Sequence, residues 1–117
     1  MSDKIKRGKE GEKLAEGFLV DKGFSVLKRN YRYRRSEIDL IVRRDNWLIF
    51  VEVKTRTSNA FGYPEEFVEP SQEKKIFEGA LNFMIETNWL GNVRYDIVAV
   101  DLSGIEPDIR HFEDAFY

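Results

Sequence analysis

Residues 48–54 read Leu48-Ile49-Phe50-Val51-Glu52-Val53-Lys54, an almost unbroken apolar run that decides the fold. A short run of this kind, rich in β-branched and aromatic side chains, predicts a central strand that is buried on both faces. A carboxylate in such a strand is costly to bury unless a specific partner compensates its charge. Glu52 is therefore the first candidate for a functional residue.

The residues before this run predict that it belongs to a β-hairpin. Apolar residues alternate with other side chains over residues 37–43, and a second strand is expected over residues 47–56. Asp45 and Asn46 lie between the two strands, and these residue types tolerate the positive φ angles of a tight turn. With Asp45 and Asn46 as the turn, the strand pairing can be counted outward from it.

This register places Asp39 directly opposite Glu52 on one face of the sheet. Like charges in that position repel, so the pair indicates a compensating cation or proton, and hard divalent ions such as Mg²⁺ favour oxygen ligands. Lys54 follows Glu52 by two residues and is expected on the same face, within reach of a metal-bound water or a phosphate. The alternative, an ordinary exposed salt-bridged face, is disfavoured by the apolar run around Glu52.

Apolar spacing and breaker residues outline the rest of the fold. Helical spacing predicts one amphipathic helix that ends at Gly23, where a left-handed C-cap is expected, and another that ends near Asn88. The expected elements outside the hairpin are a helix over 5–22, an extended segment over 24–33, a loop over 59–70, a helix that includes 76–84, a strand over 92–102 and a short edge strand over 109–112. The predicted class is α/β, with the order αβββαββ in a single domain that spans residues 1–117.

A further acidic residue is expected near the same site. Glu12 follows Gly8 and Gly11 and lies on the apolar stripe of the first helix, the side that should be buried. The helix could thus bring a third carboxylate to the pair on the hairpin. The alternative is a partly exposed glutamate at the edge of the stripe, because acidic residues are common on this helix.

Charge is distributed unevenly along the chain. Residues 1–60 hold 15 Lys+Arg against 9 Asp+Glu, a net +6, and residues 61–117 hold 4 against 12, a net −8. Residues 28–35, in the basic half, interleave basic side chains with tyrosines, a composition suited to phosphate contacts and base stacking. A solvated edge strand is the alternative. The candidate nucleic-acid contacts in this segment are Lys28, Arg29, Arg32, Arg34 and Arg35.

Composition excludes several other classes of protein. The chain has no cysteine, so disulfides, thiolate catalysis and iron–sulfur clusters are excluded. Charges throughout the first twenty residues leave no signal peptide, and no later run approaches a membrane span, so we expect a soluble cytoplasmic protein without a membrane partner. Asp96, close to Arg94, is expected to form a salt bridge at the start of a strand, and His111 is expected to be a satisfied surface histidine.

Several motifs together resemble those of a known family. They are Gly8-x-x-Gly11-Glu12, Glu37-Ile38-Asp39-Leu40-Ile41 and Phe50-Val51-Glu52-Val53-Lys54-Thr55-Arg56, supported by Phe61-Gly62, Arg94-Tyr95-Asp96 and Asp114-Ala115-Phe116. On these residues the chain resembles the YraN family of small bacterial proteins, whose fold is similar to that of archaeal Holliday junction resolvases. The resemblance covers nearly the whole chain. It implies a restriction-endonuclease-like fold, in which a central mixed β-sheet is flanked by helices.

The resemblance also implies a nuclease site of the PD-(D/E)xK type. In such a site Asp39 and Glu52 bind metal, with the Val53 carbonyl as a further ligand. Lys54 assists the attacking water, and Glu12 corresponds to the first-helix acid of resolvases, where it would bind a second ion or orient water. The expected cofactor is Mg²⁺, and Mn²⁺ is expected to substitute for it.

Substrate and partners follow from the same resemblance. The expected reaction is hydrolysis of phosphodiester bonds in nucleic acid, with DNA favoured, and a homodimer is expected if a branched substrate is cut symmetrically. Gln72 stands where the family usually has lysine, and other nucleases of this fold use glutamine there, so Gln72 is a candidate contact to the site and to nucleic acid. The alternative function is a non-catalytic nucleic-acid-binding module or a protein adaptor that keeps the fold.

Overall fold

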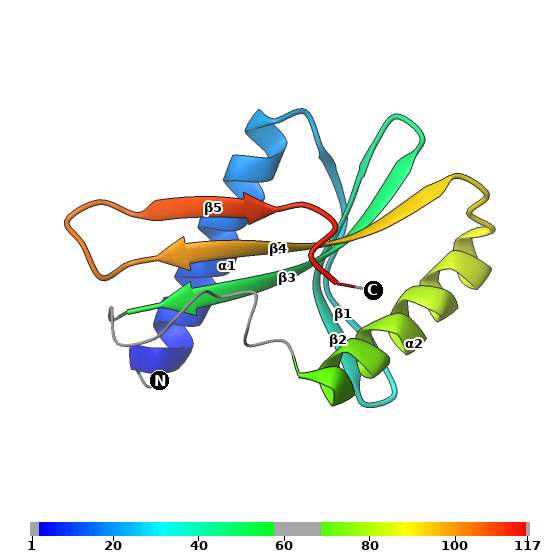
Figure 1. Cartoon of the computed structure of the whole chain (residues 1–117), viewed down its shortest axis with the longest axis horizontal. Helices are drawn as coiled ribbons and strands as arrows, with labels where there is room; N and C mark the ends of the chain where they lie inside the picture. The colour runs from blue at the N-terminus through cyan, green and yellow to red at the C-terminus, as the bar shows by residue number, and fades with distance from the viewer. Residues whose placement is uncertain (1–2, 58–68, 117) are drawn as a thin grey trace.

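The computed structural model describes residues 3–57 and 69–116, and for residues 3–5 the main chain alone (Figure 1). These residues form helices and strands in the predicted order αβββαββ. Their bounds are α1 (Asp3–Asp21), β1 (Ser25–Tyr33), β2 (Ser36–Arg44), β3 (Trp47–Arg56), α2 (Pro70–Thr87), β4 (Asn92–Asp101) and β5 (Asp108–Phe112). The loop predicted over 59–70 lies outside the described residues except for its last two positions, of which Pro70 already belongs to α2.

Three residues with positive φ angles lie at boundaries that the sequence predicted. Gly23, at φ 96°, follows α1, and Asn88, at φ 53°, ends α2 in the left-handed conformation. Asp45, at φ 54°, lies in the turn between β2 and β3. Gly, Asn and Asp adopt this conformation at the lowest cost, which is why the sequence located these three points correctly.

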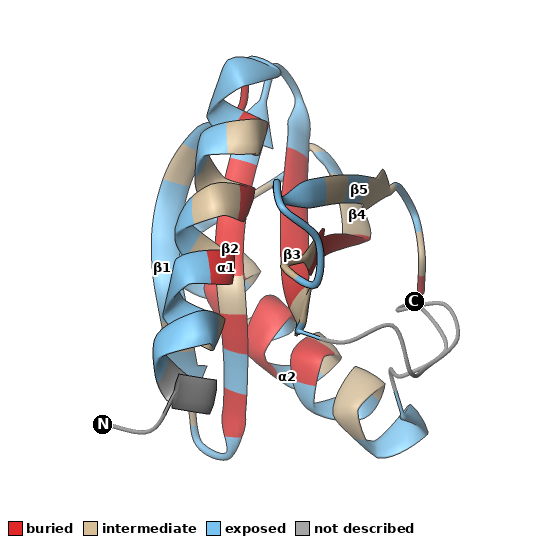
Figure 2. Cartoon of the chain, turned by 90° about the vertical axis from the view of Figure 1, so that its left-hand side faces the viewer, coloured by how far each residue is buried: buried red, intermediate tan, exposed pale blue. Residues whose placement is uncertain are grey.

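All five strands belong to one mixed sheet in the order β1-β2-β3-β4-β5. Neighbouring strands are antiparallel except β3 and β4, which are parallel. β3 is therefore the central strand, as its apolar sequence predicts, and every residue from Leu48 to Val53 is buried. β5 is an edge strand, as predicted, and β1 is the other edge, mostly exposed in Figure 2. The α/β class with a mixed sheet is confirmed.

The two helices pack against opposite faces of this sheet. α1 shares one apolar cluster with Val51 and Val98, and α2 shares a second with Phe50 and Ile97. Adjacent residues of β3 and β4 thus point to opposite faces, as expected of pleated strands. In Figure 1, α1 passes behind β3, β4 and β5, and α2 lies at the right of the view. Over the described chain, neither helix combines the length and apolarity needed to cross a membrane.

β2 and β3 separate part-way along their length. Their pairing runs from the turn to the pair Leu40–Val51, in the predicted register, and the described ladder ends there. Beyond this pair β2 continues beside β1, and β3 continues beside β4. We call the opening between β2 and β3 beyond Leu40–Val51 the fork. Asp39 is the next residue on its β2 side, and Glu52 is the next residue on its β3 side.

Candidate functional site

The carboxyl groups of Asp39 and Glu52 meet at the fork. Asp39 Oδ2 accepts a hydrogen bond from the N–H of Val53 at 2.8 Å, so a side chain connects the two strands where their ladder has ended. The two carboxyl groups are also close enough for each to influence the pKa of the other. Glu52 is buried and Asp39 is half-buried. The predicted register therefore brings these two residues together, although through their side chains and not as a backbone pair.

Lys54 and Gln72 contact Glu52 from β3 and α2. The Lys54 ammonium lies 3.9 Å from Glu52 Oε1, and its side chain is 21% exposed. Gln72 donates from Nε2 to Glu52 Oε1 at 3.1 Å, and its Oε1 accepts from Lys54 Nζ at 3.5 Å. Both β3 side chains thus project from one face, as strand alternation predicts. Gln72 belongs to the same hydrogen-bonded group, so its position agrees with the contact to the site that the resemblance implied.

Burial controls the protonation of the carboxyl pair. Desolvation first, and then the charge of Asp39, raise the pKa of Glu52 to about 8, against the opposing effects of Lys54 and Gln72. Burial also raises the pKa of Asp39, although the hydrogen bond from Val53 opposes this shift. Two buried carboxyl groups beside one ammonium keep a proton at neutral pH or take up another cation. The oxygen ligands at the fork therefore suit a hard divalent ion, which would replace that proton.

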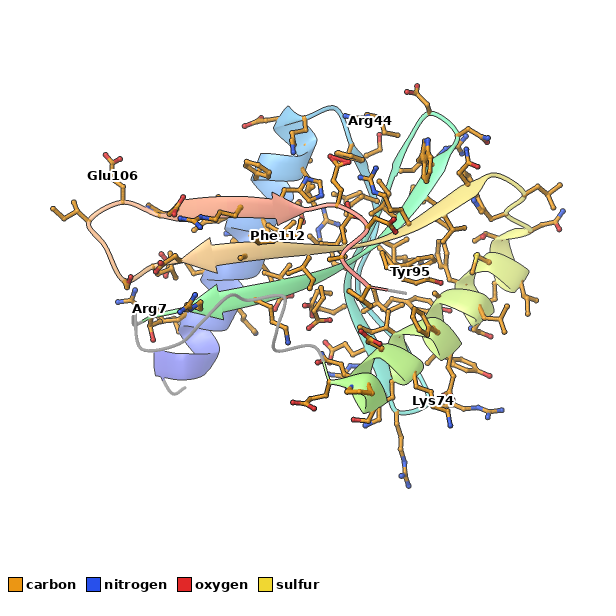
Figure 3. All side chains as sticks on the ribbon, viewed as in Figure 1. Arg7, Arg44, Lys74, Tyr95, Glu106 and Phe112 are labelled. Atoms are coloured by element: carbon orange, nitrogen blue, oxygen red, sulfur yellow. The ribbon has the colours of Figure 1, made fainter. Side chains whose placement is uncertain are left out.

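Glu12 borders this pair from α1. It lines a cleft of about 900 Å³ together with Asp39, Glu52, Arg7, Gly8, Val53, Thr55, Thr57, Leu102 and Ser103. Figure 3 places the Arg7 side chain beside the carboxyl end of β3. Burial, and then the charges of Asp39 and Glu37, raise the pKa of Glu12. Within residues 3–57 and 69–116, no three acidic or histidine side chains are gathered closely enough to hold a metal by themselves. Glu12 thus shares the cleft without completing a three-carboxylate cluster.

β1 and β2 both change the face they present next to the fork. On β1, Arg29 contacts α1, whereas Tyr31, two residues later, contacts α2. On β2, Leu40 packs in the cluster of α1 and Ile38 packs in the cluster of α2. Side chains two residues apart share a face in a regular strand, so each strand must turn over between these positions. Asn30, at φ 50°, provides this irregularity on β1.

Asn30 is a residue of the site that the sequence reasoning missed. With its amide nitrogen turned toward the acidic side chains, it donates to Glu12 Oε1 at 2.8 Å and to Glu37 Oε1 at 3.2 Å. It therefore connects α1 to β2 next to Asp39. Asparagine is uncommon inside strands and tolerates positive φ, and this was the signal available in the sequence.

Gly11 allows α1 to approach the site closely. A Cβ atom at Gly11 would overlap the side chain of Thr55 on β3, whereas a Cβ atom at Gly8 would meet nothing within 4 Å. We expect Gly11→Ala to lower the free energy of unfolding by about 1–3 kcal/mol through overpacking. Gly8→Ala, the matched control, should leave stability unchanged or raise it by about 0.5–1 kcal/mol through helix propensity. Urea unfolding of both variants measures the difference, and equal stabilities would contradict the close approach.

The predicted nucleic-acid contacts on and after β1 divide into two groups. Arg29 donates hydrogen bonds of 2.6 and 2.9 Å to a glutamate of α1, and Arg32 lies 3.2 Å from Glu37. Both charges are thus compensated within the protein. The remaining basic residues are exposed and are Lys28 on β1 and Arg34 with Arg35 in the turn before β2.

The tyrosines of this segment are occupied by contacts within the protein. Tyr31 Oη accepts a hydrogen bond of 2.7 Å from Asn82, and its ring packs edge-on against Phe83. The guanidinium of Arg34 lies over the ring of Tyr33, 5.2 Å from its centroid. Both rings thus have partners within the protein, and base stacking by this segment stays a prediction. In this segment Tyr31 packs against α2, which is distant in sequence, and Tyr33 makes a cation–π contact with Arg34 in the turn.

The environment of His111 also differs from the expectation. Arg94 and Asp96 form the predicted salt bridge, with hydrogen bonds of 2.8 and 2.9 Å. His111, however, is not a surface histidine, because its side chain is 3% exposed and its Nε2 lies 2.7 Å from Asp96 Oδ2. Lys22, directly after α1, contacts Nδ1 at 2.9 Å, and the rings of Phe18 and Phe24 pack edge-on against the imidazole. The predicted edge strand suggested exposure, but α1 covers this face of β5.

Two lysines near the site were also missed. Lys74 and Lys75 belong to the acidic half of the sequence, yet they line the same surface hollow as Arg34 and Arg35. Counting charge by halves could not reveal this, because the fold brings α2 beside the turn between β1 and β2.

Comparison with known proteins relates the chain to one family. Residues 11–100 match the family model described as Uncharacterised protein family UPF0102. The chain is 42% identical over 110 residues to the UPF0102 protein FP2501 of Flavobacterium psychrophilum, covering 94% of this chain and 92% of the relative. It is 43% identical over 110 residues to a UPF0102 protein of Anaeromyxobacter dehalogenans (93% and 82%) and 38% identical over 117 residues to one of Christiangramia forsetii (100% and 98%). The chain therefore belongs to the UPF0102 family.

Proposed function

We propose that this protein is a metal-dependent nuclease that hydrolyses phosphodiester bonds in DNA or another structured nucleic acid. The observation that carries the proposal is the hydrogen-bonded group at the fork. Asp39 and Glu52 meet there, and Lys54 and Gln72 both contact Glu52. Two carboxylates with a lysine two residues after the second one form the arrangement expected of a PD-(D/E)xK site.

We further propose that residues 1–117 form a single domain with a restriction-endonuclease-like fold. This proposal is supported by a mixed sheet with one helix on each face and by the location of the candidate site where two central strands diverge. One such domain contacts a short length of nucleic acid, so a second copy of the chain is the proposed partner for symmetric cutting of a branched substrate.

The residues at the fork fit Mg²⁺ or Mn²⁺. Asp39, Glu52 and the Val53 carbonyl would hold the ion, because these are hard oxygen donors and the buried carboxyl pair lacks a full set of compensating charges. Mg²⁺ is usually bound by one or two carboxylates and several waters, so a three-carboxylate cluster is not required. When bound, such an ion polarises a phosphate and lowers the pKa of a coordinated water.

The surrounding side chains have distinct roles in this proposal. Lys54 places a positive charge beside Glu52, where it stabilises negative charge that develops on the phosphate. Gln72 holds Lys54 and Glu52 in position through its amide, and Glu12 orients water or adds a carboxylate for a second ion. Glu12 shares the cleft with Glu52, and Lys54 and Gln72 reach Glu52 from β3 and α2.

The test is calorimetric titration of Mg²⁺ and Mn²⁺ into the wild-type chain, with cleavage of labelled branched, duplex and single-stranded substrates followed in parallel. Asp39→Asn is expected to weaken metal binding by about 100-fold and to abolish cleavage, because it removes a direct ligand. Asp45→Asn is the matched control, since it makes the same change at the other end of the hairpin and Asn tolerates the φ of 54° there.

Each outcome separates the proposal from its alternatives. Loss of both metal binding and cleavage in Asp39→Asn, with neither lost in Asp45→Asn, supports the nuclease. Salt-sensitive nucleic-acid binding that is unchanged by Mg²⁺ and by Asp39→Asn would instead identify a non-catalytic binding module. Wild-type protein that binds no metal, even with nucleic acid present, contradicts the proposed centre directly.

A further inference from the structure

Four exposed basic side chains gather beside the candidate site. Arg34 and Arg35 form the turn between β1 and β2, and Lys74 and Lys75 belong to the first turns of α2. All four line one surface hollow with Ser71 and Glu78. Figure 3 shows the side chain of Lys74 extending away from α2. We call Arg34, Arg35, Lys74 and Lys75 the basic surface.

The charges of the basic surface are uncompensated by ion pairs. Among the parts of the chain that the structure describes, none of the four side chains lies within ion-pairing distance of a carboxylate. This distinguishes them from Arg29 and Arg32, whose charges are paired with glutamates. Unpaired cations that converge from two elements create a positive potential suited to a polyanion.

The basic surface is continuous with the fork. An adjoining hollow is lined by Arg35 and Lys75 together with Ser71, Gln72, Glu37 and Ile76. Gln72 in turn donates a hydrogen bond to Glu52. A ligand that lies on the four cations can therefore extend past Gln72 to the carboxyl pair. The charge is placed along a path to the site and not on a remote face.

The turn itself is not optimised for folding. Arg34 has a φ of 56°, a left-handed conformation that Gly or Asn would adopt at lower cost. The turn at the other end of β2, between β2 and β3, has Asp45 at its left-handed position. An arginine at this point therefore supplies a charge that the turn geometry does not require.

The basic surface offers phosphate contacts, and the two tyrosines of β1 that precede it in the chain are engaged in other contacts. Tyr31 is hydrogen-bonded to Asn82 and packed on Phe83, and the guanidinium of Arg34 lies over the ring of Tyr33. Proteins that hold single strands without sequence preference depend on exposed aromatic rings for stacking. Contacts made by Arg and Lys alone suit a backbone whose phosphates are already held at regular spacing, as in a duplex.

We propose that the basic surface binds the phosphate backbone of a duplex nucleic acid and directs one of its strands past Gln72 into the fork. The inference rests on the proposed nuclease function for its purpose, but binding can be measured without cleavage. It predicts affinity that depends on salt and on these four residues, with little preference among base sequences.

The experiment measures binding of a labelled duplex by the full chain in EDTA, by fluorescence anisotropy over a range of KCl concentrations. The test variant combines Arg34→Asn, Arg35→Gln, Lys74→Gln and Lys75→Gln. Its affinity should fall by about 10²–10³-fold near 100 mM salt, and the slope of log K against log salt should become shallower by about 3–4. Arg110→Gln is the control, because Arg110 is exposed on β5 at the other edge of the sheet and pairs with Asp108.

The single variant Arg34→Asn is the control for loss of folding. It should be at least as stable as the wild type and bind the duplex more weakly. Unchanged affinity and slope in the four-residue variant would overturn the inference. So would a wild-type chain that binds no duplex at any salt, or one that binds a single strand of equal length as tightly as the duplex.

Cleavage by the wild type in Mg²⁺ is recorded separately, so the two proposals can fail independently. If the wild type cleaves and the four-residue variant binds and cleaves equally well, the nuclease proposal stands and the proposed role of the basic surface is rejected. If duplex binding depends on the four residues but no metal supports cleavage, the role of the basic surface stands and the nuclease proposal is rejected.

Discussion

Lys54→Met is expected to reduce the rate of cleavage by about 10²–10³-fold, the effect typical of removing one group that stabilises charge in a transition state. The Lys54 ammonium lies 3.9 Å from Glu52 Oε1 and 3.5 Å from Gln72 Oε1, so it is held beside the carboxyl pair. Methionine keeps an unbranched apolar stem in this half-buried position and removes the charge. Single-turnover cleavage at saturating Mg²⁺ measures the loss.

The same variant should retain most of its metal binding, since Lys54 is not a ligand in the proposed centre. We expect the affinity for Mg²⁺ to change by less than about tenfold, in contrast to Asp39→Asn. Arg110→Met is the matched control, because Arg110 is exposed on β5 and outside the hydrogen-bonded group at the fork. Cleavage by Lys54→Met within about threefold of the wild type would show that the ammonium has no part in the reaction.

The elements that flank the site were predictable because their signals are local. The hairpin register depends on a turn of two residues, and Asp45 and Asn46 are residue types that favour it. Once that turn is fixed, period-two alternation determines which side chains of β2 and β3 face each other. These two rules place Asp39 and Glu52 on the same face at the same position along the hairpin.

The opening of the sheet was not predictable by the same rules. Regular alternation fails at Asn30, where β1 turns over, and β2 changes face between Leu40 and Ile38. This change depends on packing against two helices that are remote in sequence, and no periodicity encodes it. The fork is thus a tertiary feature, although the residues that occupy it were identified from the chain.

The sequence also could not predict which charged side chains gather from distant elements, or which polar side chains distant elements bury. Lys74 and Lys75 join the Arg34–Arg35 turn only because α2 returns to lie against β1 and β2. His111 is buried because Phe18 of α1 and Phe24, directly after that helix, pack against its ring. The sequence shows the two lysines and the histidine. It does not show their neighbours in the fold, which lie tens of residues away along the chain.

Asp96→Asn is expected to lower the free energy of unfolding by about 3–5 kcal/mol, because it breaks a buried ionic network by removing one partner. The Asp96 side chain is fully buried and accepts hydrogen bonds from Arg94 at 2.8 and 2.9 Å and from the N–H of Asp114 at 3.0 Å. Its Oδ2 also lies 2.7 Å from His111 Nε2, and that imidazole contacts Lys22. Asparagine keeps the shape but leaves the charge of Arg94 with the exposed Glu113 as its remaining partner.

The stabilising effect of the Asp96 carboxylate is expected to decrease at acidic pH. Burial opposes ionisation of Asp96, but hydrogen bonds from His111, Arg94 and Asp114 outweigh it and hold the pKa of the carboxyl below its ordinary value of 3.8. The unfolded chain therefore takes up this proton first as the pH falls, and the contribution of the carboxylate to stability is complete above 3.8 and is lost below it. The gap in stability between wild type and Asp96→Asn should stay constant from neutral pH down to about pH 5 and narrow under more acidic conditions.

Urea unfolding at several pH values measures this gap, and Asp108→Asn provides the control. Asp108 pairs with Arg110 on β5 at 3.3 Å, but its side chain is 57% exposed, so its loss should cost less than about 1 kcal/mol. A large gap for Asp96→Asn that narrows in acid, beside a small one for Asp108→Asn, would show that the network between Lys22, β4 and β5 fixes the edge of the sheet. Equal costs for the two variants would mean instead that Arg94 and His111 find water or other partners when the carboxylate is gone, and that apolar packing alone holds β5 in place.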